Sequence, residues 1–383
     1  MKIAFICTEK LPSPAIKGGA IQLMIDGITP YFAKKHSLTI YSIEDPQLPS
    51  RSVENEIKYV RFPKEDYYFD VANDVSKESY DVIHIFNRPK EVKRIRHASP
   101  TSTIITSLHN DMFSPLKITK HEAIEAIKYT DRFTTVSEYI KRSLIDRYPL
   151  AKEKTMVVYS GVDLKDYPKR YSKLGRAIRK QIRKELNIEN KKVILFVGRL
   201  SKTKAPDLLI KAMYEVIKEH PDAVLVIVGG KWFSDNGMND YVRILHELAT
   251  PISDHVIFTN YIPSKDIPSI LLAGDLLVCS SRWHEPLARI HYEGMAAQLP
   301  IITTNRGGNA EVILNGINGL VIDQYNQIES FSKAICYLLQ KPELCQTMGR
   351  NGRLLTEMYF TFEHTANRLE IVYEKGVLEN NMK

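Results

Sequence analysis

Short apolar runs rich in β-branched residues recur along the chain, separated by stretches in which apolar residues repeat at helical spacing. In the first half the runs cover 2–7, 38–42, 57–62, 81–86, 103–108, 132–136 and 155–160. Such runs, without clean alternation, are typical of strands buried on both faces. Helices are predicted over 20–35 and over 137–147, where Ser137 is a suitable N-cap. Strands alternating with helices predict a parallel, doubly wound α/β sheet.

The pattern restarts after a polar, basic stretch at 161–190. Further strands are predicted over 191–200, 223–230, 255–259, 276–280 and 300–304, with a helix over about 207–220. We therefore expect two tandem Rossmann-like domains facing a cleft, with boundaries at 1–165 and 166–360. Residues 361–383 are expected to pack back on the first domain, through a helix over 361–377 with these apolar residues: Phe362, Ala366, Leu369, Ile371, Val372 and Tyr373.

Composition narrows the class of protein. A 26% share of charged residues and 44% hydrophobic residues exclude a disordered chain. The four cysteines show no C-x-x-C spacing, and H-E-x-x-H is absent, so neither a disulfide framework nor a zinc motif is indicated. No apolar run approaches the roughly 18 residues of a membrane span, and no leader is recognisable. We expect a cytoplasmic protein.

The net charge of +8 is unevenly distributed. Basic residues concentrate at 165–192 and at 88–97. The simplest interpretation is a solvated helix face, because basic side chains normally sit in water. The alternative is attraction to an anionic partner: a membrane surface, an acidic glycan or a phosphorylated substrate. Nucleic acid is disfavoured, because zinc-finger spacing and RNP-type aromatic motifs are absent.

Several common catalytic motifs are missing. The first predicted strand is not followed by G-x-G-x-x-G, and neither a P-loop nor G-x-S-x-G occurs. D-x-D is also absent, which removes the usual metal-binding signal of nucleotide-sugar enzymes with a single Rossmann-like domain. Gly18 and Gly19, by contrast, stand directly before the first predicted helix, where glycine admits a ligand and the helix N-terminus favours phosphate. An ordinary glycine turn is the alternative.

Arg199 and Lys204 lie just beyond the first strand of the second half. Open α/β sheets bind ligands at the carboxyl ends of their strands, and a guanidinium fork beside an ammonium suits a diphosphate. Two solvated loop cations would be the alternative. Neither residue is expected in the core, so folding is expected not to depend on them.

Glu285 and Glu293 are separated by seven residues. Pro286 suits the first turn of a helix, which would put Glu285 at its N-terminus and both carboxylates on a similar face. The free N–H groups would then meet a phosphate and Glu293 a ligand hydroxyl. A helix cap and a surface charge are the alternatives.

The order of the motifs is more specific than any one of them. Gly-Gly is followed by SLHNDM (107–112), GVD (161–163), GRLSKTK (198–204), E-x7-E, GGNAE (307–311) and NGINGL (315–320). This order resembles the retaining GT-B glycosyltransferases of family 4, the glycosyl transferases group 1, over nearly the whole chain. Within that group, 2–22 and 280–313 look most like the spore-coat-associated glycosyltransferases of bacilli.

The resemblance implies a nucleoside-diphosphate sugar as donor, a glycan, lipid or small molecule as acceptor, retention of configuration, and no metal or other cofactor. It also implies a role for each motif residue. Gly18 and Gly19 would lie against the donor diphosphate, which Arg199 and Lys204 would neutralise. Backbone N–H groups of Leu287, Ala288 and Arg289 would hold the distal phosphate, Glu293 the ribose and Glu285 the sugar hydroxyls, with His109 near the reacting sugar. A packed core or loop histidine is the alternative for His109.

Two departures from the family pattern stand out. The family usually has glycine where this chain has Ala205, and often E-P-F-G where it has E-P-L-A (285–288). Neither change removes a charge, so we interpret them as altered donor-pocket detail. Two rival functions stay open: a nucleotide-sugar epimerase of the same fold, and a non-catalytic structural protein of the spore coat.

Overall fold

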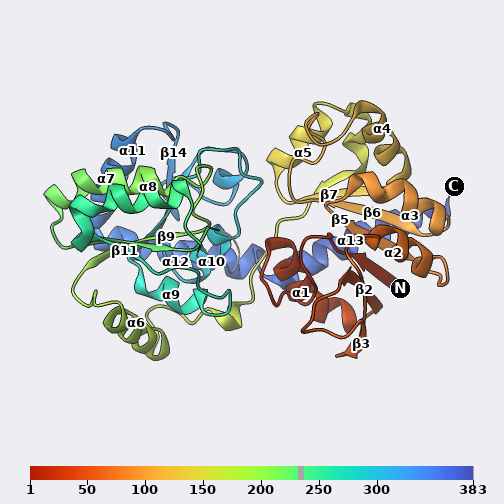
Figure 1. Ribbon diagram of the computed structural model, residues 1–383, viewed down its shortest axis with the longest axis horizontal. Coiled ribbons are helices and arrows are strands. Elements are labelled where there is room, and N and C mark those ends of the chain that lie inside the picture. Colours follow the sequence, from red (N-terminus) through yellow and green to blue (C-terminus); the bar gives the residue numbers. More distant parts are fainter. Residues whose placement is uncertain (232–236, 383) are drawn as a thin grey trace. The chain divides into compact units, whose positions relative to one another are not determined.

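The computed structural model describes residues 1–231 and 237–382 and divides them into two compact units (Figure 1). Unit 1 contains Met1–Gly161 together with the segment from Phe362 onwards, and unit 2 is Val162–Thr361. The sequence placed these boundaries at 165/166 and 360/361, within a few residues of the observed ones. Within the described residues, no helix is both long and apolar enough to cross a membrane.

Unit 1 is built on an eight-stranded sheet with the order β3-β4-β2-β1-β5-β6-β7-β8, in which only the edge strand β3 is antiparallel. The central strands are buried on both faces, as their apolar, β-branched runs without clean alternation predict. The strands are β1 (Lys2–Ile6), β2 (Ser37–Ile43), β3 (Arg51–Glu54), β4 (Ile57–Phe62), β5 (Val82–Phe86), β6 (Thr103–Leu108), β7 (Arg132–Thr135) and β8 (Thr155–Val157). The helices are α1 (Ala20–Ala33), α2 (Tyr67–Val75), α3 (Val92–Ala98), α4 (Lys120–Tyr129), α5 (Glu138–Ile145) and α13 (Phe362–Asn381).

The second parallel sheet belongs to unit 2 and has six strands in the order β11-β10-β9-β12-β13-β14. The chain starts in the middle at β9, moves outward to β10 and β11, then returns to β12 on the other side of β9. The strands are β9 (Lys192–Val197), β10 (Ala223–Val228), β11 (Val256–Phe258), β12 (Leu276–Cys279), β13 (Ile301–Thr304) and β14 (Gly319–Ile322). The helices are α6 (Lys173–Glu185), α7 (Pro206–Glu219), α8 (Asp240–Ala249), α9 (Ile267–Ala273), α10 (Ile290–Ala296), α11 (Ile328–Leu339) and α12 (Pro342–Tyr359).

The last helix, α13, packs in unit 1, as predicted. Its Leu369, Val372 and Tyr373 join the core formed by α1 and the sheet. The Tyr373 hydroxyl lies 2.5 Å from Nδ1 of the buried His84 on β5. Ile371, predicted among the apolar residues of this helix, is instead 55% exposed because it lies on the opposite side of α13. The helix thus ties the end of the chain to its first strands.

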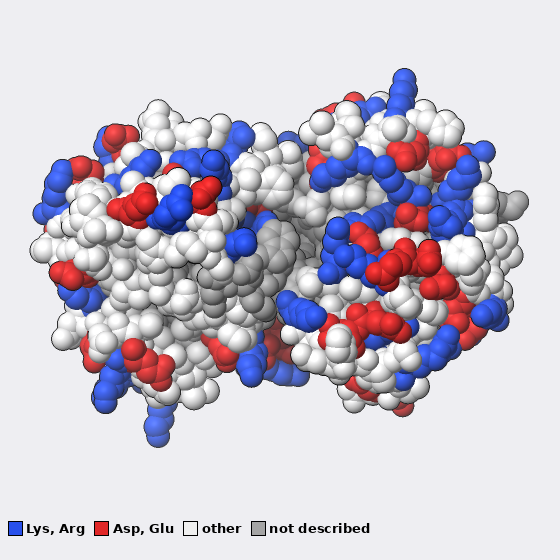
Figure 2. Space-filling model, in the orientation of Figure 1, with Lys and Arg blue, Asp and Glu red and all other residues white. Residues whose placement is uncertain are grey.

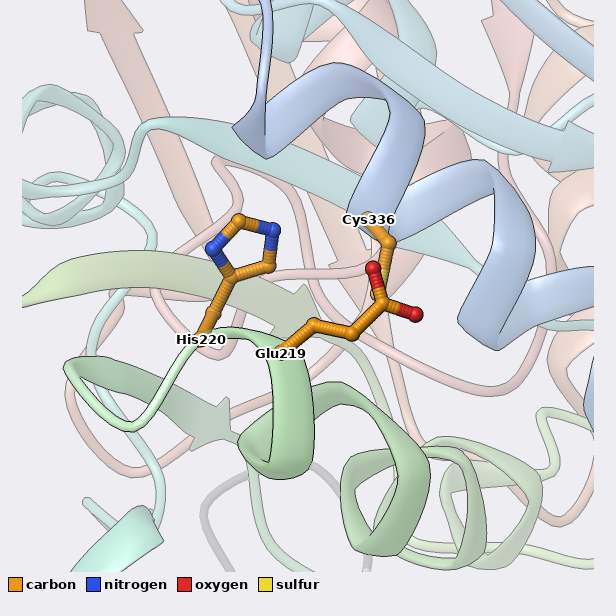
Figure 3. A group of neighbouring side chains, drawn as sticks. All are labelled: Glu219, His220 and Cys336. Carbon is orange, nitrogen blue, oxygen red and sulfur yellow. The ribbon is translucent and has the colours of Figure 1, made fainter.

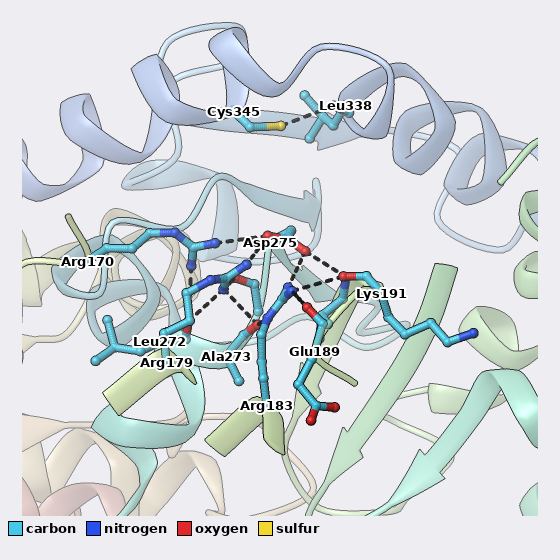
Figure 4. Close-up of polar contacts among 12 residues, drawn as sticks. Arg170, Arg179, Arg183, Glu189, Lys191, Leu272, Ala273, Asp275, Leu338 and Cys345 are labelled. Carbon is cyan, nitrogen blue, oxygen red and sulfur yellow. Dashed lines mark hydrogen bonds and ion pairs between the residues drawn. The ribbon is translucent and has the colours of Figure 1, made fainter. Parts of the chain in front are cut away.

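The basic stretch at 165–192 is only partly a solvated surface. Arg170, Arg179 and Arg183 converge on Asp275, at 3.0, 2.6 and 2.6 Å, at the end of α9 (Figure 4). Arg179 also donates to the carbonyls of Leu272, Ala273 and Gly274, the free acceptors at the C-terminus of α9. For these three arginines the solvated-face interpretation is wrong, because Arg179 and Arg183 bind α6, and Arg170 binds the segment before it, to the end of α9 within unit 2.

The other cations of α6 are exposed. Lys173, Arg176, Lys180 and Lys184 follow one another at helical spacing and form what we call the α6 stripe. Within the described residues, none of the four pairs with an acidic side chain.

The second basic segment, 88–97, is neutralised by acidic partners. Arg88 pairs with Glu9, and Arg96 with Asp131. Three further pairs complete the set: Lys90–Glu122, Lys93–Glu125 and Arg94–Glu91. Figure 2 accordingly shows acidic and basic side chains interspersed on the visible surface. This segment does not form a free basic patch.

Candidate active site

The strand order of unit 2 locates a ligand crevice before any side chain is considered. Neighbouring strands β9 and β12 lead their helical connections away in opposite directions along the sheet. In open α/β sheets, such a switch point opens a crevice at the carboxyl ends of the two strands. The loops at this position run from Gly198 to Ala205 after β9, and from Ser280 to Arg289 after β12. Most of the residues predicted for the donor lie in these two loops.

Lys204 and Glu285 meet across this switch point. The Lys204 Nζ lies 2.5 Å from Glu285 Oε1, and the same oxygen accepts a hydrogen bond from the Ser281 hydroxyl at 2.8 Å. Glu285 is only 3% exposed. Burial opposes its ionisation, but the Lys204 ammonium and the hydrogen bonds outweigh burial and hold the pKa of Glu285 below its ordinary value. The site therefore presents a buried, ionised carboxylate whose cation comes from the neighbouring loop.

The backbone beneath Lys204 is held in an unusual conformation. Ala205 adopts φ 54° and ψ 47°, the left-handed region, which explains why the family pattern has glycine there. The Ser280 hydroxyl lies 2.9 Å from the Lys204 carbonyl and 3.0 Å from the Ala205 carbonyl. The fully buried alanine and the serine together fix the turn that aims Lys204 at the crevice.

A second ion pair links the loop after β12 to the start of α7. Arg282 binds Asp207 at the start of α7 in a bidentate manner, at 2.9 and 2.8 Å, and the Tyr241 hydroxyl donates to the same carboxylate at 2.5 Å. The Arg282 N–H also donates to the Thr203 carbonyl. Fork geometry of this kind fixes orientation as well as distance. Sequence reasoning missed these residues, because no pattern links position 207 to position 282.

The prediction of a helix that begins at Pro286 is wrong. The helix α10 starts at Ile290, so Glu285 lies before it and does not share a helix with Glu293. Glu285 instead forms a β-bridge with Gly307, and its carbonyl accepts the Gly308 N–H at 2.8 Å. A Cβ on Gly307, at φ 65°, would stand 2.0 Å from the Glu285 carbonyl oxygen. Pairing with the loop after β13 therefore keeps Glu285 extended, a conformation also favoured before proline.

The segment from Leu287 to Arg289 precedes α10 as an irregular loop rather than a helix turn. The Ala288 N–H donates to Asn309 Oδ1 at 3.3 Å, so this predicted phosphate donor is already engaged by the GGNAE loop. Arg289 Nη2 lies 3.4 Å from Glu293 Oε1, and both side chains are largely buried. Glu293 is therefore not the surface charge of the alternative interpretation.

His291, which the sequence analysis did not single out, holds this loop through a hydrogen bond to its backbone. It is fully buried, and its Nδ1 lies 2.9 Å from the Ala288 carbonyl, while Nε2 lies 2.8 Å from the Thr303 hydroxyl. Since a carbonyl only accepts, Nδ1 carries the proton and Nε2 accepts from Thr303. Burial lowers the pKa of His291 to about 4, so the imidazole is neutral. A histidine three residues from Ala288 is too common a spacing to have indicated this role.

Arg199 lies half-buried in the same loop as Lys204, between β9 and α7, as predicted. Within unit 2, the structure thus gathers Lys204, Glu285 and the 287–289 segment around one switch point, with Arg199 on the β9 side of it.

Unit 1 has its own switch point, between β1 and β5. The loop after β1 carries Glu9, which Arg88 binds through two contacts of 2.6 and 2.7 Å and to which Tyr68 donates at 2.8 Å. Burial alone would raise the pKa of Glu9, but its hydrogen bonds with Arg88 lower it to about 2. Sequence analysis assigned Arg88 to a basic surface cluster and overlooked Glu9. Their ion pair lies at the switch point of unit 1, as Lys204–Glu285 lies at that of unit 2.

His109 follows β6 at the same edge of the sheet. Its N–H donates to Asn87 Oδ1 at 3.0 Å, and its Nε2 lies 3.2 Å from the Ser107 hydroxyl. Burial lowers the pKa of His109 to about 4, which leaves the ring neutral. It is only partly exposed and lies in the loop after β6, so its role near the reacting sugar stays a prediction beside the alternative of a packed loop histidine.

Gly18 and Gly19 lie directly before α1, with φ of 74° and 100°. A Cβ on Gly19 would stand 2.5 Å from Leu11 and 2.6 Å from Gln22, so a side chain there would displace its neighbours. The Asp26 carboxylate accepts the Ala15 N–H at 2.7 Å and fixes the preceding loop onto α1. The Gly-Gly turn is thus a constrained backbone segment at the carboxyl edge of the sheet.

Comparison with known proteins identifies the class. The model "Glycosyltransferase Family 4" matches residues 26–166, and "Glycosyl transferases group 1" matches residues 178–355. The chain is 53% identical over 381 residues to YtcC of Bacillus subtilis (strain 168), a protein named as a glycosyltransferase; the match covers 100% of this chain and 94% of YtcC. The chain therefore belongs to the glycosyl transferases group 1 family, as its motif order predicted.

One further relative and one solved structure extend the comparison. Spore coat protein SA of Bacillus subtilis (strain 168) is 44% identical over 376 residues, covering 98% of this chain and 100% of that protein. The crystal structure of Anabaena HepE in complex with UDP shares the fold, with a TM-score of 0.80 at 21% identity, over 98% of this chain and 100% of HepE. HepE has also been crystallised with UDP-glucose. The predicted GT-B fold of two Rossmann-like domains and the spore-coat resemblance are both confirmed.

Proposed function

We propose that this glycosyltransferase moves a sugar from a nucleoside-diphosphate donor to an acceptor hydroxyl, with retention of anomeric configuration and without a metal ion. The observation that carries the proposal is the Lys204–Glu285 pair at the switch point of unit 2. A cation there can neutralise a diphosphate, while the adjacent buried carboxylate can accept hydrogen bonds from sugar hydroxyls. The proposed reaction uses both the cation and the carboxylate where the donor's diphosphate joins its sugar.

The proposed reaction is driven by electrostatics. As the C1–O bond to the diphosphate breaks, negative charge grows on the leaving phosphate, where Arg199 and Lys204 stabilise it. Glu285 holds the sugar through its hydroxyls, and Glu293 binds the ribose. The acceptor oxygen attacks C1 from the face that the phosphate leaves, and its proton passes to a phosphate oxygen. Since the protein supplies the cations, no metal is required.

The loop at 287–289 would hold the distal phosphate with backbone N–H groups. Because Asn309 already accepts from Ala288, donor binding would have to displace or share that hydrogen bond. Gly18, Gly19 and His109 keep the roles that the family resemblance implies. A neutral His109 would hydrogen-bond a sugar hydroxyl and would not act as a cation.

Uracil is the first donor base to test, because HepE binds UDP and UDP-glucose. The relationship to Spore coat protein SA supports a link to the spore coat. We propose that the acceptor is a spore-coat or cell-surface glycan and that transfer takes place in the mother-cell cytoplasm. A thermal-shift screen with UDP, GDP and ADP and their sugars tests the donor. A donor present at 100-fold excess over its Kd raises the free energy of unfolding of the protein by about 2.7 kcal/mol.

The reaction itself is tested by incubating the protein with the stabilising donor, with and without acceptor extract, and following the anomeric signals by NMR. We expect product or hydrolysed sugar with the donor's anomeric configuration, and the same rate in EDTA. A new epimer without acceptor would identify the rival isomerase. Stabilisation by none of the nucleoside diphosphates would refute the proposal and favour the structural spore-coat role.

A further inference from the structure

A group of three metal-ligating side chains lies away from the donor crevice, at the opposite end of α7. Glu219 and His220 stand at the C-terminus of this helix, and Cys336 faces them from α11 (Figure 3). One ligand atom from each residue lies within 4.8 Å of the other two. Among the described residues, this is the group of three or more His, Cys, Asp and Glu side chains close enough to hold a metal ion.

The buried histidine of this group has one ring nitrogen without a hydrogen-bond partner. His220 is 7% exposed, and its Nε2 is buried with no hydrogen-bond partner among the described residues. Its other nitrogen, Nδ1, lies 3.1 Å from Lys192 Nζ. A buried ring nitrogen without a partner is unfavourable, because it has lost its water without gaining a hydrogen bond. The nitrogen left over is thus the one available to a ligand.

We propose that Glu219, His220 and Cys336 form a binding site for a zinc-class divalent cation. An imidazole nitrogen, a thiolate and a carboxylate oxygen are the three ligand types that Zn²⁺ combines, with water left to complete a tetrahedron. The carboxylate and the thiolate balance the two charges of the ion. Glu219 is exposed, so the ion has a path to the two buried ligands.

Neighbouring residues complete the arrangement. Gln340 Nε2 donates to Glu219 Oε2 at 3.1 Å, and the Cys336 thiol also hydrogen-bonds the Glu219 carboxylate, so an ion bound there would take the place of the thiol proton. Metal ligation through Nε2 puts the proton on His220 Nδ1, where it opposes the Lys192 ammonium. Lys192 then turns to Asp222, whose Oδ1 lies 3.5 Å from its Nζ. Lys192 is therefore a residue that weakens metal binding.

The site has a mechanical consequence that is separate from catalysis. The 14 residues of α7 rise about 1.5 Å each, so the cation would sit roughly 20 Å along the helix from the Lys204 loop. It would pin the C-terminus of α7 to α11 inside unit 2. Metal removal should then lower the stability of unit 2 while leaving turnover of the folded enzyme unchanged.

The absence of zinc spacing in the sequence does not argue against this site. Motif spacing detects ligands that lie within one loop or helix, whereas Cys336 reaches the other two from a different helix. The packing of α11 on α7 brings them together.

The test uses the full-length protein, stripped with chelator and titrated with Zn²⁺ by calorimetry and with Co²⁺ by absorption spectroscopy. We expect one ion per chain, a thiolate-to-cobalt charge-transfer band, and, at about 100-fold excess over Kd, a Tm rise of roughly 5–10 °C. His220→Gln and Glu219→Gln should weaken Zn²⁺ binding by more than the roughly 10–100-fold cost of an outer-shell change. Cys336→Ala should abolish the cobalt band.

Cys345→Ala is the matched control, because Cys345 is a partly buried thiol in α12, outside the group, that contacts the Leu338 carbonyl. It should leave Zn²⁺ affinity unchanged, and Lys192→Met should increase it. Absence of stoichiometric binding to the wild type, or an unchanged cobalt band in Cys336→Ala, would overturn the proposal. Loss of enzyme turnover in proportion to metal removal would instead contradict the metal-free reaction.

Discussion

Replacing Lys204 with alanine should do more than weaken ligand binding. The sequence suggested that this loop cation is dispensable for folding, but its ammonium is the cation for Glu285, which is 3% exposed. Lys204→Ala leaves that carboxylate buried without its partner. Removing one member of a buried ion pair costs about 3–5 kcal/mol, because the remaining charge is uncompensated.

The lower end of that range applies here. The Lys204 side chain is 20% exposed, so water can enter where the ammonium stood, and Ser281 still donates to Glu285. We expect a loss of about 3 kcal/mol. At 2–4 °C per kcal/mol for a unit of this size, the Tm of unit 2 should fall by about 6–12 °C.

A double-mutant cycle measured by urea unfolding separates this effect from simple truncation. Lys204→Ala/Glu285→Gln should be more stable than Lys204→Ala, because the neutral amide needs no cation, and the coupling should be about 2 kcal/mol. Lys202→Ala, an exposed lysine of the same loop, should change stability by less than about 0.5 kcal/mol. Additive single effects, or a Lys204→Ala variant as stable as wild type, would refute the reasoning.

Three further predictions concern other parts of the molecule. Glu285→Gln should depress turnover strongly but leave affinity for the free nucleoside diphosphate within a few-fold; equal losses in steady-state rate and calorimetric affinity would mean that Glu285 does not act selectively on the sugar. Burial raises the pKa of Asp26 to about 6, so ionisation of this carboxyl lowers the stability of unit 1 as pH rises from about 4 through 6. Asp26→Asn should therefore stabilise unit 1 by about 2–3 kcal/mol at pH 8 but little at pH 4. Thermal unfolding of Asp26→Asn across that range should lose the wild-type pH dependence, and a constant difference would contradict the assignment. Replacing the lysines of the α6 stripe with serine should reduce sedimentation with anionic vesicles at low salt, an attraction that fades at physiological ionic strength, where the Debye length is ~8 Å; no wild-type sedimentation at low salt would show that the stripe is only solvated.

The elements of regular structure could be predicted because their signals are local. The strands at 57–62 and 103–108 are short runs rich in β-branched or aromatic residues, and Ser137 caps α5 by accepting the Ile140 N–H, as expected. The short strands β3 and β14 were missed: β3 is an exposed edge with Val53 73% exposed, and β14 begins at a glycine. Such strands exist because a neighbour offers hydrogen bonds, which no local pattern records.

The positions of the charged motif residues in the fold were predictable, whereas their partners were not, and their donor-binding roles stay predictions. Arg199, Lys204 and Glu285 could be identified because motif order and strand ends indicate them. The start of α10 was misplaced because the bridge between Glu285 and Gly307 competes with helix formation. His291 acts through a contact that only the folded chain creates. Long-range pairing determined each of these outcomes.

The most direct test of a diphosphate site at the unit 2 switch point is calorimetry of UDP and uridine against wild type and Arg199→Ala. A charge-assisted contact to the diphosphate contributes about 1.5–3 kcal/mol of binding free energy, so Arg199→Ala should weaken UDP binding by roughly ten- to a hundredfold. Uridine affinity should stay within about twofold, because the nucleoside carries no phosphate. UDP affinity equal to wild type in this variant would mean that the diphosphate does not bind at the loop after β9.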